Sequence, residues 1–181
     1  MNAEETVLRY LDAHEDRLAE LSRVIWERPE LGGLERFASG LLVDELKSAG
    51  FFVDMGVGQM PTAFVASWGE GKPIIGILGE YDALPGLSQK VAPTREPIED
   101  GAPGHGCGHN LLGVGALGAA LAAKEAMEKA NLKGTIRFYG CPAEESLSGK
   151  VYMARDGVFD DLDAALSWHP ADVNNVSNLL T

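Results

Sequence analysis

A short apolar run, Ile74-Ile75-Gly76-Ile77-Leu78, restricts the fold more than any other feature of the chain. Consecutive apolar residues bury both faces of a strand, which is typical of a central strand in a sheet that is covered on both sides. An Ala- and Gly-rich helical pattern over residues 111–130 and a β-rich run over residues 135–139 follow later in the chain. A strand, a helix and a strand in this order build a parallel sheet, so we predict an α/β fold.

The remaining segments agree with this prediction. Apolar residues at spacings of three and four predict a helix ending before Pro29 and a second helix over residues 34–46, with Gly50 at its C-terminal cap. Further strands are expected at residues 51–57, 62–68, 73–78 and 164–166, and residues 87–104 form a polar, proline-rich loop. Asn110 is expected to cap the helix that follows it. With 181 residues, one domain is the expectation.

Composition excludes several classes of partner. The chain carries 15 Lys and Arg against 27 Asp and Glu, a formal charge of -12, so a nucleic acid backbone would be repelled. No apolar run approaches the ~20 residues of a spanning helix, and the acidic N-terminus does not resemble a secretory signal, so no membrane contact is expected. The two cysteines, Cys107 and Cys141, are therefore interpreted as free thiols or metal ligands in a cytoplasmic protein.

The loop from Gly104 to Asn110 concentrates metal-binding side chains. His105, Cys107 and His109 alternate with glycines, which leave the backbone room to fold around an ion. A thiol and imidazoles are the ligands that borderline and soft divalent metals prefer. We interpret this loop as half of a metal site.

Other chemistry-bearing side chains follow predicted strands. Glu80 and Asp82 come after the central strand, Glu144 and Glu145 after residues 135–139, and His169 after residues 164–166. Each has an ordinary alternative: an acidic turn, two glutamates that begin a helix, and a structural histidine. One parallel sheet would nevertheless bring all of them to the same edge, the usual place for chemistry in an open α/β sheet.

Four motifs, in this order and at these intervals, resemble those of the dinuclear-metal aminoacylase/carboxypeptidase amidohydrolases, and within this family the p-aminobenzoyl-glutamate hydrolase branch. The motifs are Glu80-Tyr-Asp82-Ala-Leu-Pro85, His105-Gly-Cys107-Gly-His109-Asn110, Pro142-Ala-Glu144-Glu145 and Trp168-His169-Pro170. The resemblance implies a three-layer αβα domain with a mostly parallel central sheet.

The resemblance also implies roles for single residues. Cys107 would bridge two divalent metal ions, zinc or manganese, with His109 and His169 completing the shell of one ion and Glu145 binding the other. Glu144 would be the general base. Asp82 would orient a ligand without touching the metal, and His105 would either do the same or pack the loop.

The activity implied is hydrolysis of the amide bond of an N-acyl amino acid, p-aminobenzoyl-glutamate first and a dipeptide second. Full-length relatives are more than twice as long and are expected to be homo-oligomers. We therefore expect residues 1–181 to be the N-terminal portion of the catalytic domain, without the lid and dimerisation domain or the later metal-binding histidine. Alone, such a portion should bind at most one ion tightly, hydrolyse little and leave an unfinished sheet edge.

Two other interpretations remain open at this point. The chain could be a non-catalytic metal-binding or scaffolding subunit that a second chain completes. Cys107 could also serve a redox or structural role without a metal.

Overall fold

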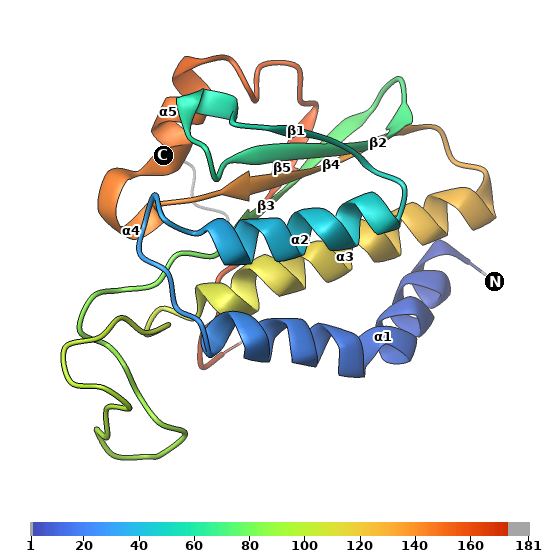
Figure 1. The fold of residues 1–181 in the computed structure, drawn as a ribbon. Helices are drawn as coiled ribbons and strands as arrows, with labels where there is room; N and C mark the ends of the chain where they lie inside the picture. The colour runs from blue at the N-terminus through green and yellow to red at the C-terminus, as the bar shows by residue number, and fades with distance from the viewer. Residues whose placement is uncertain (1, 174–181) are drawn as a thin grey trace.

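A computed structural model describes residues 2–173 as helices packed on a single sheet (Figure 1). The helices are α1 (Ala3–Trp26), α2 (Arg36–Ser48), α3 (His109–Ala130), α4 (Glu144–Leu147) and α5 (Gly149–Arg155), with a 3-10 turn η1 (Val57–Gln59). The strands are β1 (Phe52–Met55), β2 (Phe64–Glu70), β3 (Ile74–Glu80), β4 (Gly134–Cys141) and β5 (Ala164–Leu166). The last eight residues, including the chain end at Thr181, lie outside the described part.

The sheet has the order β1-β2-β4-β3-β5. β4 and β5 both pair with β3 in parallel, whereas β2 is antiparallel to β4 and to β1. Within residues 2–173, β2 is therefore the one strand that runs against the other four. The sheet is mixed and open, and the predicted α/β class is confirmed.

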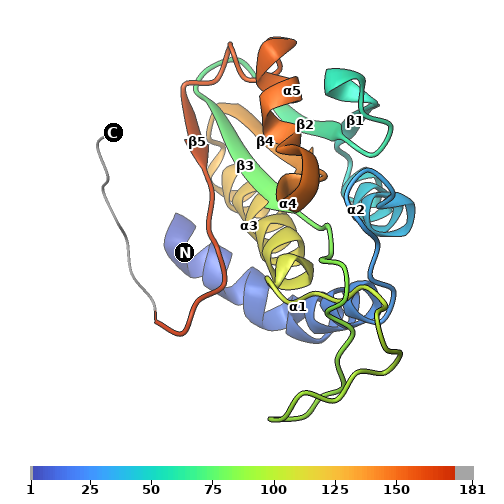
Figure 2. The same cartoon turned by 90° about the vertical axis from the view of Figure 1, so that its left-hand side faces the viewer.

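Two apolar cores lie on the two faces of the sheet because successive strand residues alternate between them. Phe138 belongs to the core beneath α1, α2 and α3, and its neighbour Tyr139 belongs to the smaller core on the opposite face. The second core contains Met153 of α5 and the turn residues that follow this helix. Helices and turns thus cover both faces of the sheet, as three layers require (Figure 2).

The central helix α3 lies close to the sheet because it contains glycine at the contact. A Cβ at Gly113 would lie 2.6 Å from the carbonyl oxygen of Glu80, so only glycine permits this approach. The contact sets the start of α3 beside the carboxyl end of β3.

The prediction that Asn110 caps this helix is wrong. Helix α3 already begins at His109, and Gly108, with a φ of 81°, occupies the cap position without a side-chain hydrogen bond. The Asn110 amide instead donates a hydrogen bond to Ser22 of α1, at 3.0 Å. A glycine that adopts the left-handed conformation starts the helix two residues earlier than the side-chain signal indicated.

The edge strand β5 pairs with β3 alone, and all three of its residues are exposed. None of the helices in residues 2–173 combines the length and the apolar composition needed to cross a membrane.

Candidate metal centre

The candidate ligands gather at one edge of the sheet because β3, β4 and β5 are parallel and end there. Glu80 ends β3 opposite Cys141 of β4, so the segments after these two strands leave the sheet side by side. The chain after β5 is fixed to the start of α3, where the Trp168 indole donates a hydrogen bond to the Leu112 carbonyl oxygen at 3.2 Å. This hydrogen bond places the adjacent residue, His169, over the loop that carries the thiol.

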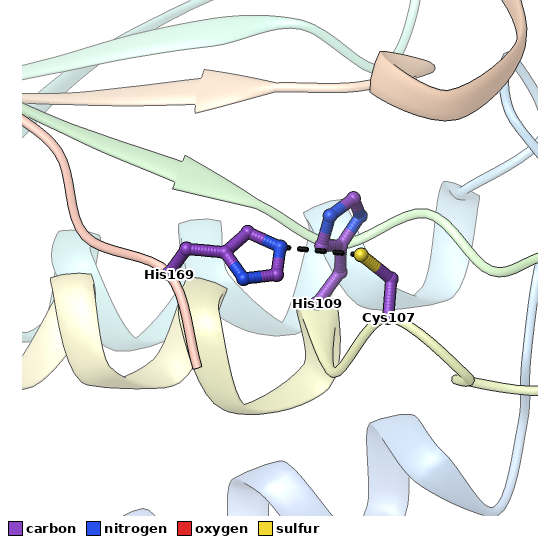
Figure 3. A group of neighbouring side chains, drawn as sticks. All are labelled: Cys107, His109 and His169. Carbon is purple, nitrogen blue, oxygen red and sulfur yellow. Dashed lines mark hydrogen bonds between the residues drawn. The ribbon is translucent and has the colours of Figure 1, made fainter. Parts of the chain in front are cut away.

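Three predicted ligands lie within reach of one another. The ligand atoms of Cys107, His109 and His169 are all within 4.8 Å of each other. The sulfur of Cys107 lies 3.2 Å from Nε2 of His169, and the two imidazole rings meet edge to face at 5.8 Å between centroids. Figure 3 shows the ring of His169 and the thiol of Cys107 pointing towards one another, in direct contact.

His109 is held in a defined orientation. Its Nδ1 lies 2.9 Å from Oδ1 of Asp82, and because a carboxylate only accepts hydrogen bonds, Nδ1 carries the proton. The side chain is 1% exposed, and its Nε2 has no hydrogen-bond partner among the described residues. A buried ring nitrogen without a hydrogen-bond partner is costly, and a metal ion would satisfy it. The residues present therefore fit a bound cation.

Asp82 contacts two parts of the site. Its second oxygen, Oδ2, accepts a hydrogen bond from the backbone N–H of Glu145 at 3.0 Å. Burial alone would raise the pKa of Asp82, but these hydrogen bonds lower it below the ordinary value. Burial alone would lower the pKa of His109, but the carboxylates of Asp82, Glu80 and Glu145 outweigh it, and the pKa lies above its ordinary value. The arrangement matches the carboxylate–histidine pairs found at metal sites.

The two adjacent glutamates begin the four-residue helix α4. Left-handed residues bracket this helix, Ala143 with a φ of 55° and Ser148 with a φ of 52°. An oxygen of Glu145 lies 4.0 Å from Nε2 of His109, and an oxygen of Glu144 lies within 4.8 Å of ligand atoms of His109 and Glu80. The glutamates thus begin a helix, as the ordinary interpretation has it, and also face the histidine.

Cys107 is a weak acid in these surroundings. Burial, followed by the carboxylates of Glu145, Glu144 and Glu80, raises its pKa to about 12. A reactive thiol needs the opposite environment, one that lowers the pKa. The surroundings therefore disfavour the redox interpretation of this residue, whereas a coordinating cation would deprotonate the thiol.

His105 lies beside the other candidates and is absent from both groups of converging ligand atoms. Its two ring nitrogens are buried, and burial lowers its pKa to about 4, so the ring is neutral at pH 7.

Two residues that the sequence did not single out support this edge of the sheet. Glu35 is fully buried, and it accepts hydrogen bonds from the Thr62 hydroxyl at 2.9 Å and from the Ala143 N–H at 2.7 Å. Lys150 of α5 forms an ion pair with Glu80. A glutamate before a helix and a lysine within one are usual in any protein, so no sequence signal identified either residue.

The comparisons with known proteins agree with this geometry. A model of the peptidase family M20/M25/M40 matches residues 76–178. A subunit of the p-aminobenzoyl-glutamate hydrolase of Escherichia coli is 49% identical over 174 residues, which cover 94% of this chain and 36% of that protein. The Xaa-Arg dipeptidase of Mus musculus is 34% identical over 91% of this chain and 37% of its own length. The chain thus spans little more than a third of these curated relatives.

Solved structures show the same fold. A dinuclear metal-binding peptidase of the M20 family from Bacillus subtilis superposes with a TM-score of 0.72 at 29% identity, covering 88% of this chain and 44% of that chain. An aminohydrolase described as putative, from methicillin-resistant Staphylococcus aureus, gives a TM-score of 0.74 at 25% identity, covering 93% and 42% of the two chains.

Proposed function

The chain belongs to peptidase family M20/M25/M40, and we propose on this basis that it is part of a metal-dependent amidohydrolase. The proposed substrate is an N-acyl amino acid, with p-aminobenzoyl-glutamate the first candidate and a dipeptide the second. Both follow from the activities for which the relatives from Escherichia coli and Mus musculus are named. Because the chain covers 36% of the first of these, we further propose that it corresponds to the N-terminal portion of the catalytic domain.

One observation carries the proposal. The buried Nε2 of His109 has no hydrogen-bond partner among the described residues, while Nδ1 is fixed by Asp82 and the thiol of Cys107 and the ring of His169 lie within reach. A cluster with only a structural role would pair such a nitrogen with another side chain or with the backbone. We propose that Cys107, His109, Glu145 and His169 bind two divalent cations.

The proposed chemistry is the addition of water to an amide carbonyl. The bound cations would supply Lewis acidity towards the carbonyl oxygen and the attacking water. Glu144 would accept the proton of the water as its oxygen forms the new bond to the carbonyl carbon, and would pass that proton to the leaving nitrogen as the C–N bond breaks. Asp82 would hold His109 and the Glu145 backbone in place, and His105 would either orient a ligand or pack the loop.

Metal, location and assembly are proposed as follows. Thiolate and imidazole ligands suit zinc, whereas the surrounding carboxylates also suit manganese. Cys107 and Cys141 are both free thiols, which fits a reducing cytoplasm. The exposed edge strand β5 would suit further pairing, and we propose a homo-oligomer for the whole enzyme.

The variant Glu144→Gln in the whole gene product tests the proposal. We expect release of p-aminobenzoate from p-aminobenzoyl-glutamate to fall about 10²- to 10⁴-fold, because the general base is lost. The metal content, measured by elemental analysis, should equal that of the wild-type protein. Glu70→Gln, which changes an exposed residue at the far end of β2, is the matched control and should change neither quantity.

The same variant addresses the scaffolding interpretation. A non-catalytic subunit would show no dependence of hydrolysis on Glu144, so equal activity in the wild-type protein and Glu144→Gln would refute the proposed role. A wild-type protein that retains no metal after purification and reconstitution would refute the metal centre itself.

A further inference from the structure

Glu80 has an oxygen without a hydrogen-bond donor inside the candidate centre. Its side chain is 9% exposed, and Oε1 is paired with Nζ of Lys150. The other oxygen, Oε2, lies 3.1 Å from Nε2 of His109. No donor among residues 2–173 contacts Oε2, so one oxygen of a buried carboxylate faces one nitrogen of a buried imidazole.

The two atoms are placed as two ligands of one cation would be. Nδ1 of His109 faces the Asp82 carboxylate, so Nε2 is the ring nitrogen left to bind a metal ion. A cation bound at Nε2 would also lie beside Oε2, which is 3.1 Å away. Nε2 has no hydrogen-bond partner among the described residues.

The spacing of the two atoms fits two ligands of one metal ion. Zinc lies roughly 2.0–2.2 Å from nitrogen and carboxylate ligands, so two ligands of one ion can stand 3.1 Å apart. An oxygen of Glu144 lies within 4.8 Å of ligand atoms of both residues, so the proposed general base would stand beside the ion that Glu80 and His109 share.

We propose that Glu80 is a further carboxylate ligand of the metal centre and that Lys150 holds it in orientation. The inference rests on the proposed metal-dependent function and adds a ligand that none of the motif-derived roles includes.

The position of Lys150 follows from its neighbour. A Cβ at Gly149 would lie 2.0 Å from the carbonyl oxygen of Pro142, so glycine alone lets α5 start this close to the segment that carries the glutamate pair. Lys150 then reaches across to β3 and binds Oε1 of Glu80. The pair leaves Oε2 directed at His109.

Metal titration of four proteins tests the inference. The metal-free whole gene product, in reducing buffer, is titrated with Zn²⁺, and separately with Mn²⁺, in competition with a chromophoric chelator. Glu80→Gln should weaken binding at least ~10-fold, since even residues behind the ligands cost 10- to 100-fold. Lys150→Met should weaken it less than Glu80→Gln does, because the carboxylate remains, and the control Glu70→Gln should not change it.

Three outcomes would overturn the inference. Binding by Glu80→Gln within threefold of wild type would exclude a ligand, and this result would leave the proposed function intact. Equal losses in Glu80→Gln and Lys150→Met would show a purely structural ion pair. A wild-type protein that binds neither metal would overturn both the inference and the proposed function.

A second comparison keeps the inference testable if the variant Glu80→Gln does not fold. If circular dichroism shows that Glu80→Gln is unfolded, the double variant Glu80→Gln/Lys150→Met leaves neither charge buried without its partner. This protein should bind Zn²⁺ about 10-fold more weakly than Lys150→Met alone. Equal binding by the two would overturn the proposed role of Glu80.

Discussion

Replacing Asp82 by asparagine removes one acceptor from a side chain that uses two. The Asp82 side chain is fully buried, and its oxygens accept from Nδ1 of His109 and from the N–H of Glu145. Asparagine has the same shape but one carbonyl oxygen, so either His109 or Glu145 must face an amide NH₂ group instead. One donor is therefore left without an acceptor in either orientation of the amide.

The expected loss follows from the kind of hydrogen bond. A hydrogen bond to a charged group contributes about 1.5–3 kcal/mol, so the free energy of unfolding of the metal-free protein should fall by about that amount. The affinity for Zn²⁺ should also fall, by about 10- to 100-fold, because His109 is no longer held in one tautomer and orientation. The two effects should occur together, since one side chain produces both.

Urea unfolding in the presence of EDTA, followed by tryptophan fluorescence at pH 7, measures the first effect. Competition with a chromophoric chelator measures the second. The matched control is Asp44→Asn, which changes an exposed aspartate on α2. Unfolding free energies within about 0.5 kcal/mol of wild type, together with unchanged zinc affinity, would refute the structural role assigned to Asp82.

Two further predictions concern the supports of the site. Burial raises the pKa of Glu35 above its unfolded value, so its contribution to stability is full below about pH 4 and is lost as pH rises through the folded pKa. Glu35→Gln should therefore gain stability relative to wild type between pH 4 and 7, and a constant difference in unfolding free energy would contradict this. Gly149→Ala introduces a Cβ 2.0 Å from the Pro142 carbonyl oxygen, so it should lower the free energy of unfolding by about 1–3 kcal/mol, and an unchanged urea midpoint would contradict this.

Most of the fold could be predicted because local patterns and the sheet agree. The apolar run at residues 74–78 became β3, with parallel neighbours on both sides, and the run at residues 164–166 became β5. The helical spacing of the first segment produced α1 over Ala3–Trp26. The spacing of apolar residues reports which face of a helix or strand is buried, and β3 and α1 each pack an apolar face or run in the fold.

The family resemblance read from the four motifs is confirmed by the match over residues 76–178. The convergence of Cys107, His109 and His169 follows from the rule that parallel strands end at one edge, so the sequence could predict it. The separate roles of Glu144, Glu145 and His105 stay predictions.

The supports of the site could not be predicted. Glu35 reaches Ala143, 108 residues later in the chain, only because Ala143 adopts a left-handed conformation that is rare for a residue with a side chain. Lys150 reaches Glu80 only because α5 begins at a buried glycine. Such pairings depend on turns whose geometry no local pattern specifies.

The hydrogen bond from Ala143 to Glu35 limits how far this centre can be moved between proteins. The family match begins at residue 76, inside β3, yet the carboxylate that holds the turn before the glutamate pair lies 41 residues earlier. A polypeptide cut at residue 76 would also lose β2 and uncover Phe138, which is fully buried against Phe64. The four motifs alone would therefore not form this centre in another protein. A transfer would also have to supply a carboxylate in the place of Glu35.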